Sequence, residues 1–229
     1  TQEATVSEIG SPPAPEAELY RPVLVTAGLE PVVEGGDLLG EYLGLEVARV
    51  VVDPDGSARV EAGVGRFDRE VGAMMFADLG ETDAVARAVE IVSRSRKVDA
   101  RRHPLNHLVP ERWLRAALVA DPSVVGAAEL RSVGSSLPRR TLGEEGVATA
   151  VGVDLDGRPL VVVCSTGVYL DLVPSAADDR LTHAPDARLV LAVPARDAVP
   201  VTTELATRLV QPAEVVPIAG DWRVPDGLG

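Results

Sequence analysis

Two histidines and a glutamate, His103, His107 and Glu111, are spaced four residues apart along the chain. On one continuous helix this spacing would place the three side chains on a single face, and two imidazoles with a carboxylate could then bind Zn²⁺ or Fe²⁺. Such a centre would indicate a hydrolase or another metal-dependent enzyme. Pro104 and Pro110 lie within the same stretch, however, and a helix usually ends or kinks before a proline. The alternative is that the imidazoles cap helices or lie at the junction of two units, and our prediction is that no metal or other cofactor binds.

The residues from Cys164 to Gly167 lie between an expected strand and an expected helix, where a nucleophile elbow would lie. The elbow motif requires glycine at the position of Val163, so we predict no catalytic serine or cysteine here. Ser165, Thr166 and Gly167 are instead suited to cap the start of the helix, where free backbone N–H groups can bind an anion. This predicts an alternative function, the binding of a small phosphorylated ligand.

Arg196 and Asp197 follow a strand that is expected at 188–193. In open α/β sheets, ligands bind at the carboxyl ends of the strands, so these two residues are a further candidate ligand site. The alternative is a local ion pair that caps the next helix.

The charges are unevenly distributed along the chain. Residues 87–115 contain eight basic and three acidic residues, whereas the rest of the chain contains 14 basic and 32 acidic residues. We predict that this basic segment binds an acidic protein partner, through Arg94, Arg96, Lys97, Arg101, Arg102, Arg112 and Arg115. The alternative is that these side chains pair with acidic residues of the same molecule or line a solvated helix face. Nucleic acid is not expected as a partner, because the net charge is −13 and Trp113 is the only aromatic residue in the segment.

The composition favours a folded protein in a reducing compartment. Hydrophobic residues make up 46% of the 229 residues and aromatic residues only 3%, which is enough for a core of aliphatic side chains. The single cysteine, Cys164, excludes an intrachain disulfide and a zinc site built from cysteines. No stretch approaches the roughly 18 consecutive apolar residues of a membrane span, and the first residues lack the basic and apolar regions of a signal peptide. We therefore expect a cytoplasmic location without a membrane partner.

A short motif occurs twice, as Val52-Asp53-Pro54-Asp55-Gly56 and as Val153-Asp154-Leu155-Asp156-Gly157. Both copies are suited to a tight turn between two strands, and both lack the further oxygen ligands of a calcium loop. We therefore predict an α/β protein of two related units, each a β-hairpin followed by helices, with mixed sheets that carry helices on one or both faces. The expected organisation is a disordered tail at 1–18, a first unit at 19–100, a second unit at 101–218 and a flexible tail at 219–229.

Hydrophobic periodicity locates the elements within these units. In the first unit it predicts a hairpin of strands at 45–52 and 58–64, followed by helices at 67–79 and 82–97. In the second unit it predicts a helix at 110–120 and strands at 126–133, 147–155 and 159–166. A helix that follows Gly167 and runs to about 183, with an interruption or restart near Pro174, comes next. A strand at 188–193, a helix at 199–209 and a strand at 214–218 complete the prediction.

Segments of the second unit resemble the SseB-like family. The stretches D-G-R-P-L-V-V-V-C-S-T-G at 156–167 and P-D-A-R-L-V-L-A-V-P-A-R-D-A-V-P at 185–200 are similar to that family's pattern of hairpin, apolar strand, helix and proline-rich strand. The stretch L-V-P-E-R-W-L-R-A-A-L-V-A-D-P-S-V-V-G-A-A-E-L at 108–130 resembles a second domain type of the family, in which a helix leads into a strand. The resemblance covers about half of the chain, and it implies a small α/β module without an established catalytic site.

These patterns predict a non-enzymatic protein-interaction, scaffold or regulatory module, for which a homo-oligomer is one arrangement. Two alternatives stay open. One is a hydrolase or metal-dependent enzyme that uses His103, His107 and Glu111, and the other is a binder of a small phosphorylated ligand at Ser165–Gly167.

Overall fold

The computed structural model describes residues 12–65, 69, 80–98, 103–137 and 141–223. The chain divides into two compact units, Thr1–Leu108 and Val109–Gly229. Each unit contains one β-sheet together with helices. The α/β class predicted from the sequence is therefore confirmed.

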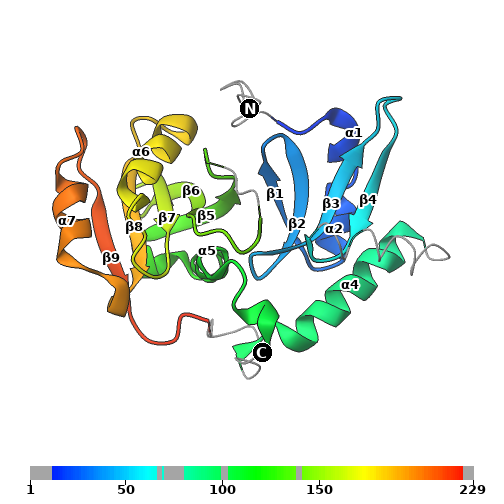
Figure 1. The fold of residues 1–229 in the computed structure, drawn as a ribbon. Helices are drawn as coiled ribbons and strands as arrows, with labels where there is room; N and C mark the ends of the chain where they lie inside the picture. The colour runs from blue at the N-terminus through cyan, green and yellow to red at the C-terminus, as the bar shows by residue number, and fades with distance from the viewer. Residues whose placement is uncertain (1–11, 66–68, 70–79, 99–102, 138–140, 224–229) are drawn as a thin grey trace. The chain divides into compact units, whose positions relative to one another are not determined.

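The first unit is built on a four-stranded antiparallel sheet whose strands follow one another in chain order (Figure 1). The strands are β1 (Glu30–Glu34), β2 (Asp37–Tyr42), β3 (Leu45–Val52) and β4 (Ala58–Ala62). Two short helices precede the sheet, α1 (Pro15–Glu18) and α2 (Arg21–Thr26). The sheet is followed by the longer helix α4 (Glu81–Ser95) and by a short 3₁₀ helix, η3 (Pro104–Asn106).

The helices of the first unit pack on the sheet through small and aliphatic side chains. α4 contacts β2, β3 and β4, and it buries Val85, Ala88 and Val92, which recur at the three- and four-residue intervals of one helix face. Gly40 of β2 allows the segment after α2 to approach closely, because a Cβ atom there would lie only 2.7 Å from Leu29 Cδ1. Burying one aliphatic side chain contributes about 1.5–3 kcal/mol, so these contacts hold the unit together.

The second unit has a five-stranded mixed sheet in the order β5-β6-β7-β8-β9. β5 (Ala127–Val133), β6 (Ala148–Asp154) and β7 (Pro159–Cys164) are antiparallel to one another. β8 (Arg188–Pro194) and β9 (Glu214–Ile218) run parallel to β7. The first parallel connection passes through α6 (Leu172–His183), and the second passes through η5 (Ala195–Asp197) and α7 (Pro200–Thr207). α5 (Pro110–Ala120) and η4 (Pro122–Val125) precede the sheet.

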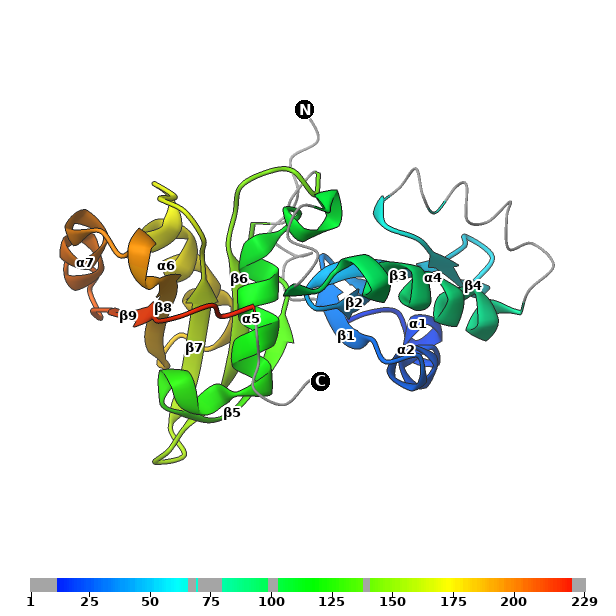
Figure 2. The same ribbon diagram turned by 90° about the horizontal axis from the view of Figure 1, so that it is seen from below.

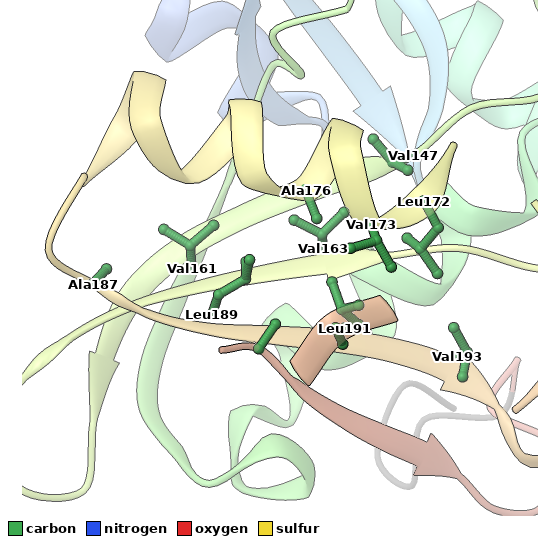
Figure 3. Packing of buried hydrophobic residues seen from close by; sticks show 12 residues of the cluster. Val147, Val161, Val163, Leu172, Val173, Ala176, Ala187, Leu189, Leu191 and Val193 are labelled. Carbon is green, nitrogen blue, oxygen red and sulfur yellow. The ribbon is translucent and has the colours of Figure 1, made fainter. Parts of the chain in front are cut away.

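The sheet of the second unit carries α5 on one face and α6 on the other (Figure 1). On the α6 side, Ala176 points toward Val163 of β7 (Figure 3). Successive residues of a strand point to opposite faces, which places Cys164 on the side of α5. The buried cluster on the α6 side is aliphatic throughout, and its members are Val147, Val161, Val163, Leu172, Val173, Ala176, Ala187, Leu189, Leu191, Val193, Ala206 and Ala213.

The segment after β9 crosses the face of the sheet that carries α5 (Figure 2). Trp222 of this segment is buried, and its ring meets that of Trp113 edge-on, with 6.5 Å between the ring centroids and an interplanar angle of 87°. The guanidinium of Arg223 lies 4.4 Å from the centroid of the Trp222 ring. The prediction of a flexible tail at 219–229 is therefore wrong for Trp222 and Arg223, whereas residues 224–229 lie outside the described part of the chain.

Other predicted elements are corrected at their ends. The tail predicted at 1–18 includes α1, in which Ala17 is buried. β1 and β2 occupy residues 30–42, where no strand was predicted. The helix predicted to follow Gly167 begins at Leu172 and continues through Pro174 without the predicted interruption. The helix predicted at 67–79 lies outside the described residues, apart from residue 69. α5 and the strands β3 to β9 lie where the sequence predicted them, within a few residues.

The repeated motif forms a similar turn in both units. The backbone N–H of the first aspartate, Asp53 or Asp154, donates to the carbonyl four residues later at 2.8 and 2.9 Å respectively. The glycines of the two motifs have φ angles of +85° for Gly56 and +77° for Gly157, which glycine adopts without strain. The surrounding sheets differ, because the first is antiparallel throughout and the second is parallel from β7 to β9.

Candidate functional site

Two candidate ligand segments come together at the carboxyl ends of β7 and β8. These strands are parallel neighbours, with Cys164 opposite Ala192, so the loops that follow them leave the sheet at the same edge. The backbone N–H of Gly167 donates to Oδ2 of Asp197 at 2.8 Å. We call this pair of loops, 165–171 and 195–199, the carboxyl-edge loops.

The bond between the two loops changes the interpretation of the predicted anion site. The N–H of Gly167, which we expected to bind an anion, already binds the carboxylate of Asp197. The following helix α6 does not begin until Leu172, so the turn at 165–167 is not at a helix N-terminus. Arg196 lies 3.6 Å from Asp197, with 74% of its side chain exposed. The two residues therefore form a local ion pair, but this pair does not cap the next helix, because α7 has no side-chain cap.

The two side chains of the turn that resemble nucleophiles are buried. Ser165 is fully buried, and its backbone N–H donates to the carbonyl of Ala192 at 3.1 Å. Within the described residues its Oγ has no hydrogen-bond partner, so no base is in place to activate it. Burial raises the pKa of the Cys164 thiol to about 12, against a smaller opposing effect of Arg115. The thiol is therefore protonated at neutral pH and unreactive.

The predicted metal ligands do not share a helix. His103 and His107 flank η3, whereas Glu111 belongs to α5. Between them Val109 has the left-handed backbone conformation, with φ +40° and ψ +54°, so the continuous helix that the metal hypothesis needs is not formed. In the parts of the chain that the structure describes, no three His, Cys, Asp or Glu residues gather as metal ligands would.

In the same segment, the imidazole of His103 caps a helix, which was the alternative to a metal site. Nδ1 of His103 accepts a hydrogen bond from the backbone N–H of Leu105 at 3.3 Å, which caps η3. Both imidazoles are exposed, whereas Glu111 is buried.

Only some side chains of the basic segment, residues 87–115, are exposed. Arg94 is exposed and bonds to Glu90, which also binds Arg87. Arg96 is fully buried. Its Nε and Nη2 donate to the carbonyl of Leu43 at 3.0 and 2.8 Å, and its Nη1 donates to the carbonyls of two residues near η3. Arg96 therefore joins α4 to the β2–β3 turn and to the end of the unit.

The remaining basic residues fall into three groups. Arg112 and Arg115 are buried on α5, where Nη1 of Arg115 donates to the carbonyl of Val133 at 3.1 Å. Lys97 is exposed. Arg101 and Arg102 lie outside the described residues. Our prediction of a docking surface is thus corrected for Arg96, Arg112 and Arg115, because buried side chains do not meet a partner.

A buried polar cluster on α6 was not predicted. The carboxylate of Asp179 is fully buried. It accepts hydrogen bonds from the backbone N–H of Ser136 at 2.5 Å, from Oγ of Ser135 at 3.1 Å and from the hydroxyl of Thr149. One turn later, Nε2 of His183 donates to the carbonyl of Gly134 at 2.8 Å. The four-residue spacing of Asp179 and His183 is the signal that could have identified them as neighbours on one helix face.

Two exposed apolar side chains were also missed. Val168 is 58% exposed and Leu170 is 82% exposed, in a loop that we had assigned to the start of a helix. They follow Gly167 directly, and the bond from Gly167 to Asp197 fixes the base of their loop. The carboxyl-edge loops therefore carry two exposed apolar side chains on one loop and the exposed guanidinium of Arg196 on the other.

Comparison with known proteins gives no match to a family model, to a curated protein or to a solved structure. Among the described helices, none combines the length and the apolar character that crossing a membrane would require.

Proposed function

We propose that the chain is a non-enzymatic protein-interaction module and that the carboxyl-edge loops bind its protein partner. The observation that carries this proposal is the exposure of Val168 and Leu170, at 58% and 82%, in a short loop tied to Asp197. Apolar area that is removed from water on binding contributes about 25 cal/mol per Å². A loop held in place before binding also loses less conformational entropy when a partner docks.

The chemistry of the neighbouring residues fits a protein partner. Arg196 is exposed on the loop that is hydrogen-bonded to the loop of the two apolar side chains. Arginine is enriched in protein interfaces, because its guanidinium donates several hydrogen bonds and its stem is apolar. The partner that fits best offers an apolar side chain for the loop and a carboxylate for Arg196. This retains the acidic partner predicted from the sequence and moves its binding site from the basic segment to the carboxyl-edge loops.

The surrounding groups support binding rather than catalysis. The thiol of Cys164 is kept protonated by burial, and the carboxylate of Asp197 is bound to Gly167. Binding without catalysis also agrees with what the resemblance to the SseB-like family implies. Cytoplasmic location remains part of the same proposal.

Site-specific photo-crosslinking in the native cell tests the proposal. A photoreactive amino acid replaces Val168, and in a matched control it replaces Val210, which is fully exposed on a different loop. We expect the Val168 probe to yield one discrete crosslinked protein that the Val210 probe does not yield. The Leu170→Asp variant, combined with the Val168 probe, is expected to reduce that product at an unchanged thermal midpoint. Equal crosslinking from both probes, or no effect of Leu170→Asp, would contradict the proposal.

A further inference from the structure

The two sheets end in four edge strands, of which three are protected against pairing with another strand. β1 contains Pro31 and β9 contains Pro217, and proline on an edge strand removes a hydrogen-bond donor. The edge of β4 is capped by side chains. Tyr20 donates its hydroxyl to the carbonyl of Ala58 at 2.6 Å, and the N–H of Val60 donates to Glu81 at 3.3 Å.

The fourth edge strand, β5, has none of these protections along its middle. It has seven residues and no proline. Among the described residues outside its own sheet, the one hydrogen bond to its backbone comes from Arg115 to Val133, at the end of the strand. As far as the described residues go, the outward-facing backbone groups along the middle of β5 therefore remain available to a further strand.

The side chains of β5 indicate which kind of strand can pair with its free edge. Glu129 and Arg131 are both exposed. They lie on either side of Leu130 in the sequence, so their two side chains point to the same face of the strand. Within the described residues neither of them forms an ion pair. Antiparallel pairing of two copies of β5 about a two-fold axis at Leu130 places Glu129 opposite Arg131 of the other copy, twice.

Other two-fold registers are less favourable. An axis at Glu129 places the two copies of Glu129 opposite each other, and an axis at Arg131 does the same for the two arginines. Like charges directly opposite each other destabilise a strand pair, whereas opposite charges stabilise it. The spacing of the charges therefore selects the register at Leu130.

We propose that a second copy of this chain binds along β5, antiparallel, with the two-fold axis at Leu130. The dimer joins two five-stranded sheets into one continuous sheet. The bulge between Ala127 and Glu129 shortens the regular part of the strand, so the association is weak and depends on concentration. This dimer does not depend on partner binding by the carboxyl-edge loops, which lie on other residues.

Variants that exchange the charges of Glu129 and Arg131 test the register. Their dimerisation is measured by sedimentation velocity over a concentration series that extends to the solubility limit. We expect the unmodified chain to dimerise. Glu129→Arg or Arg131→Glu alone replaces both ion pairs by like-charge contacts and raises the dissociation constant roughly tenfold. The double variant E129R/R131E restores the dimer. As a control, Glu204→Arg on α7 breaks an exposed ion pair with Arg208 and leaves dimerisation unchanged.

Disulfide trapping tests the axis directly. Residues opposite each other in an antiparallel pair have Cα atoms about 4.5–5.5 Å apart, which a disulfide can bridge. Leu130→Cys is therefore expected to form a covalent dimer on oxidation, while Ala128→Cys, which would face Ser132 of the other copy, is not. The native Cys164 is buried and does not interfere. A chain that stays monomeric at every concentration, or a double charge exchange that fails to restore the dimer, overturns the proposal.

Discussion

The backbone N–H of Gly167 donates a hydrogen bond to Oδ2 of Asp197, at 2.8 Å and across 30 residues of chain. The two residues follow neighbouring parallel strands, so one hydrogen bond ties together the two loops that leave the sheet at the same edge. The carboxylate also occupies the position that an external anion would take at this N–H.

Replacing Asp197 with alanine should free that position. We expect faster hydrogen exchange at the Gly167 amide and a loss of about 1 kcal/mol in the free energy of unfolding. We also expect inorganic phosphate to raise the thermal midpoint of Asp197→Ala and to leave that of the unmodified chain unchanged. Asp197→Asn is the control, because its side-chain carbonyl still accepts the hydrogen bond. Stabilisation of the unmodified chain by phosphate would favour the function as a binder of phosphorylated ligands.

Arg96 should contribute far more to stability than Arg94, although both lie in the basic segment. Arg96 is buried and binds carbonyls on both sides of α4, whereas Arg94 is exposed and forms a surface ion pair. Arg96→Ala removes a buried side chain and leaves partly buried carbonyls without their donor, and it is expected to lower the free energy of unfolding by about 3–5 kcal/mol. Arg94→Ala is expected to lower it by about 0.5 kcal/mol or less. Urea unfolding monitored by circular dichroism measures both, and equal effects would contradict the structural role of Arg96.

The contact between Trp113 and Trp222 provides a spectroscopic test of the ordered C-terminal segment. These are the only two tryptophans of the chain, and their ring centroids lie 6.5 Å apart. Trp222→Ala is expected to lower the free energy of unfolding by about 3 kcal/mol and to shift the emission of Trp113 to longer wavelength as water reaches it. Arg223→Ala removes the cation above the ring and is expected to cost about 0.5–1 kcal/mol. An unchanged Trp113 spectrum in Trp222→Ala would show that the segment does not cover α5.

Asp154 should make stability depend on pH, in contrast to Asp156 in the same turn. The backbone N–H groups of Arg158 and Asp156 donate to its carboxylate, and with nearby Arg158 and Arg188 they lower its pKa. A lowered pKa in the folded state means that the stabilisation is present above the pKa of the unfolded chain. It is lost as the pH falls through the folded pKa.

The Asp154→Asn variant should therefore be less stable than the unmodified chain at neutral pH, and the difference should shrink as the pH falls below 4, roughly the pKa of an unperturbed aspartate. Asp156→Asn is the matched control, because the side chain of Asp156 is 70% exposed. Thermal unfolding at a series of pH values measures both variants. A difference for Asp154→Asn that does not change with pH would disprove the electrostatic origin.

The elements with strong local signals could be predicted from the sequence. α5 spans Pro110–Ala120 as expected, because Pro110 starts the helix without losing a hydrogen bond and Asp121 with Pro122 ends it. The turns of the repeated motif were likewise expected from their Asp and Gly residues. β1 and β2 were missed because their segments, E-P-V-V-E and D-L-L-G-E-Y, are short and interrupted by Pro31 and Gly40. β2 pairs with β3 and β1 pairs with β2, so the strand conformation of both depends on pairing within the sheet, which is a tertiary effect.

Individual residues of the candidate site were predicted from the sequence, but the hydrogen bond that connects its two loops was not. Gly167, Arg196 and Asp197 were each identified, but the bond between Gly167 and Asp197 depends on β7 and β8 being neighbours in the sheet. The burial of Arg96 was missed because its partners are backbone carbonyls at distant positions, which no pattern of charges reveals. Trp222 was missed because a polar and glycine-containing end of a chain is typical of a flexible tail.

The connectivity of the two sheets has a consequence for the order in which the chain folds. In the first unit every pair of neighbouring strands is also consecutive in the sequence. In the second unit, the parallel pairing of β7 with β8 requires the chain to cross back through α6. Closing such long loops costs entropy before the pairing stabilises anything, so sheets of this kind form more slowly. The first unit is also synthesised first, and its sheet can be complete before β8 and β9 have left the ribosome.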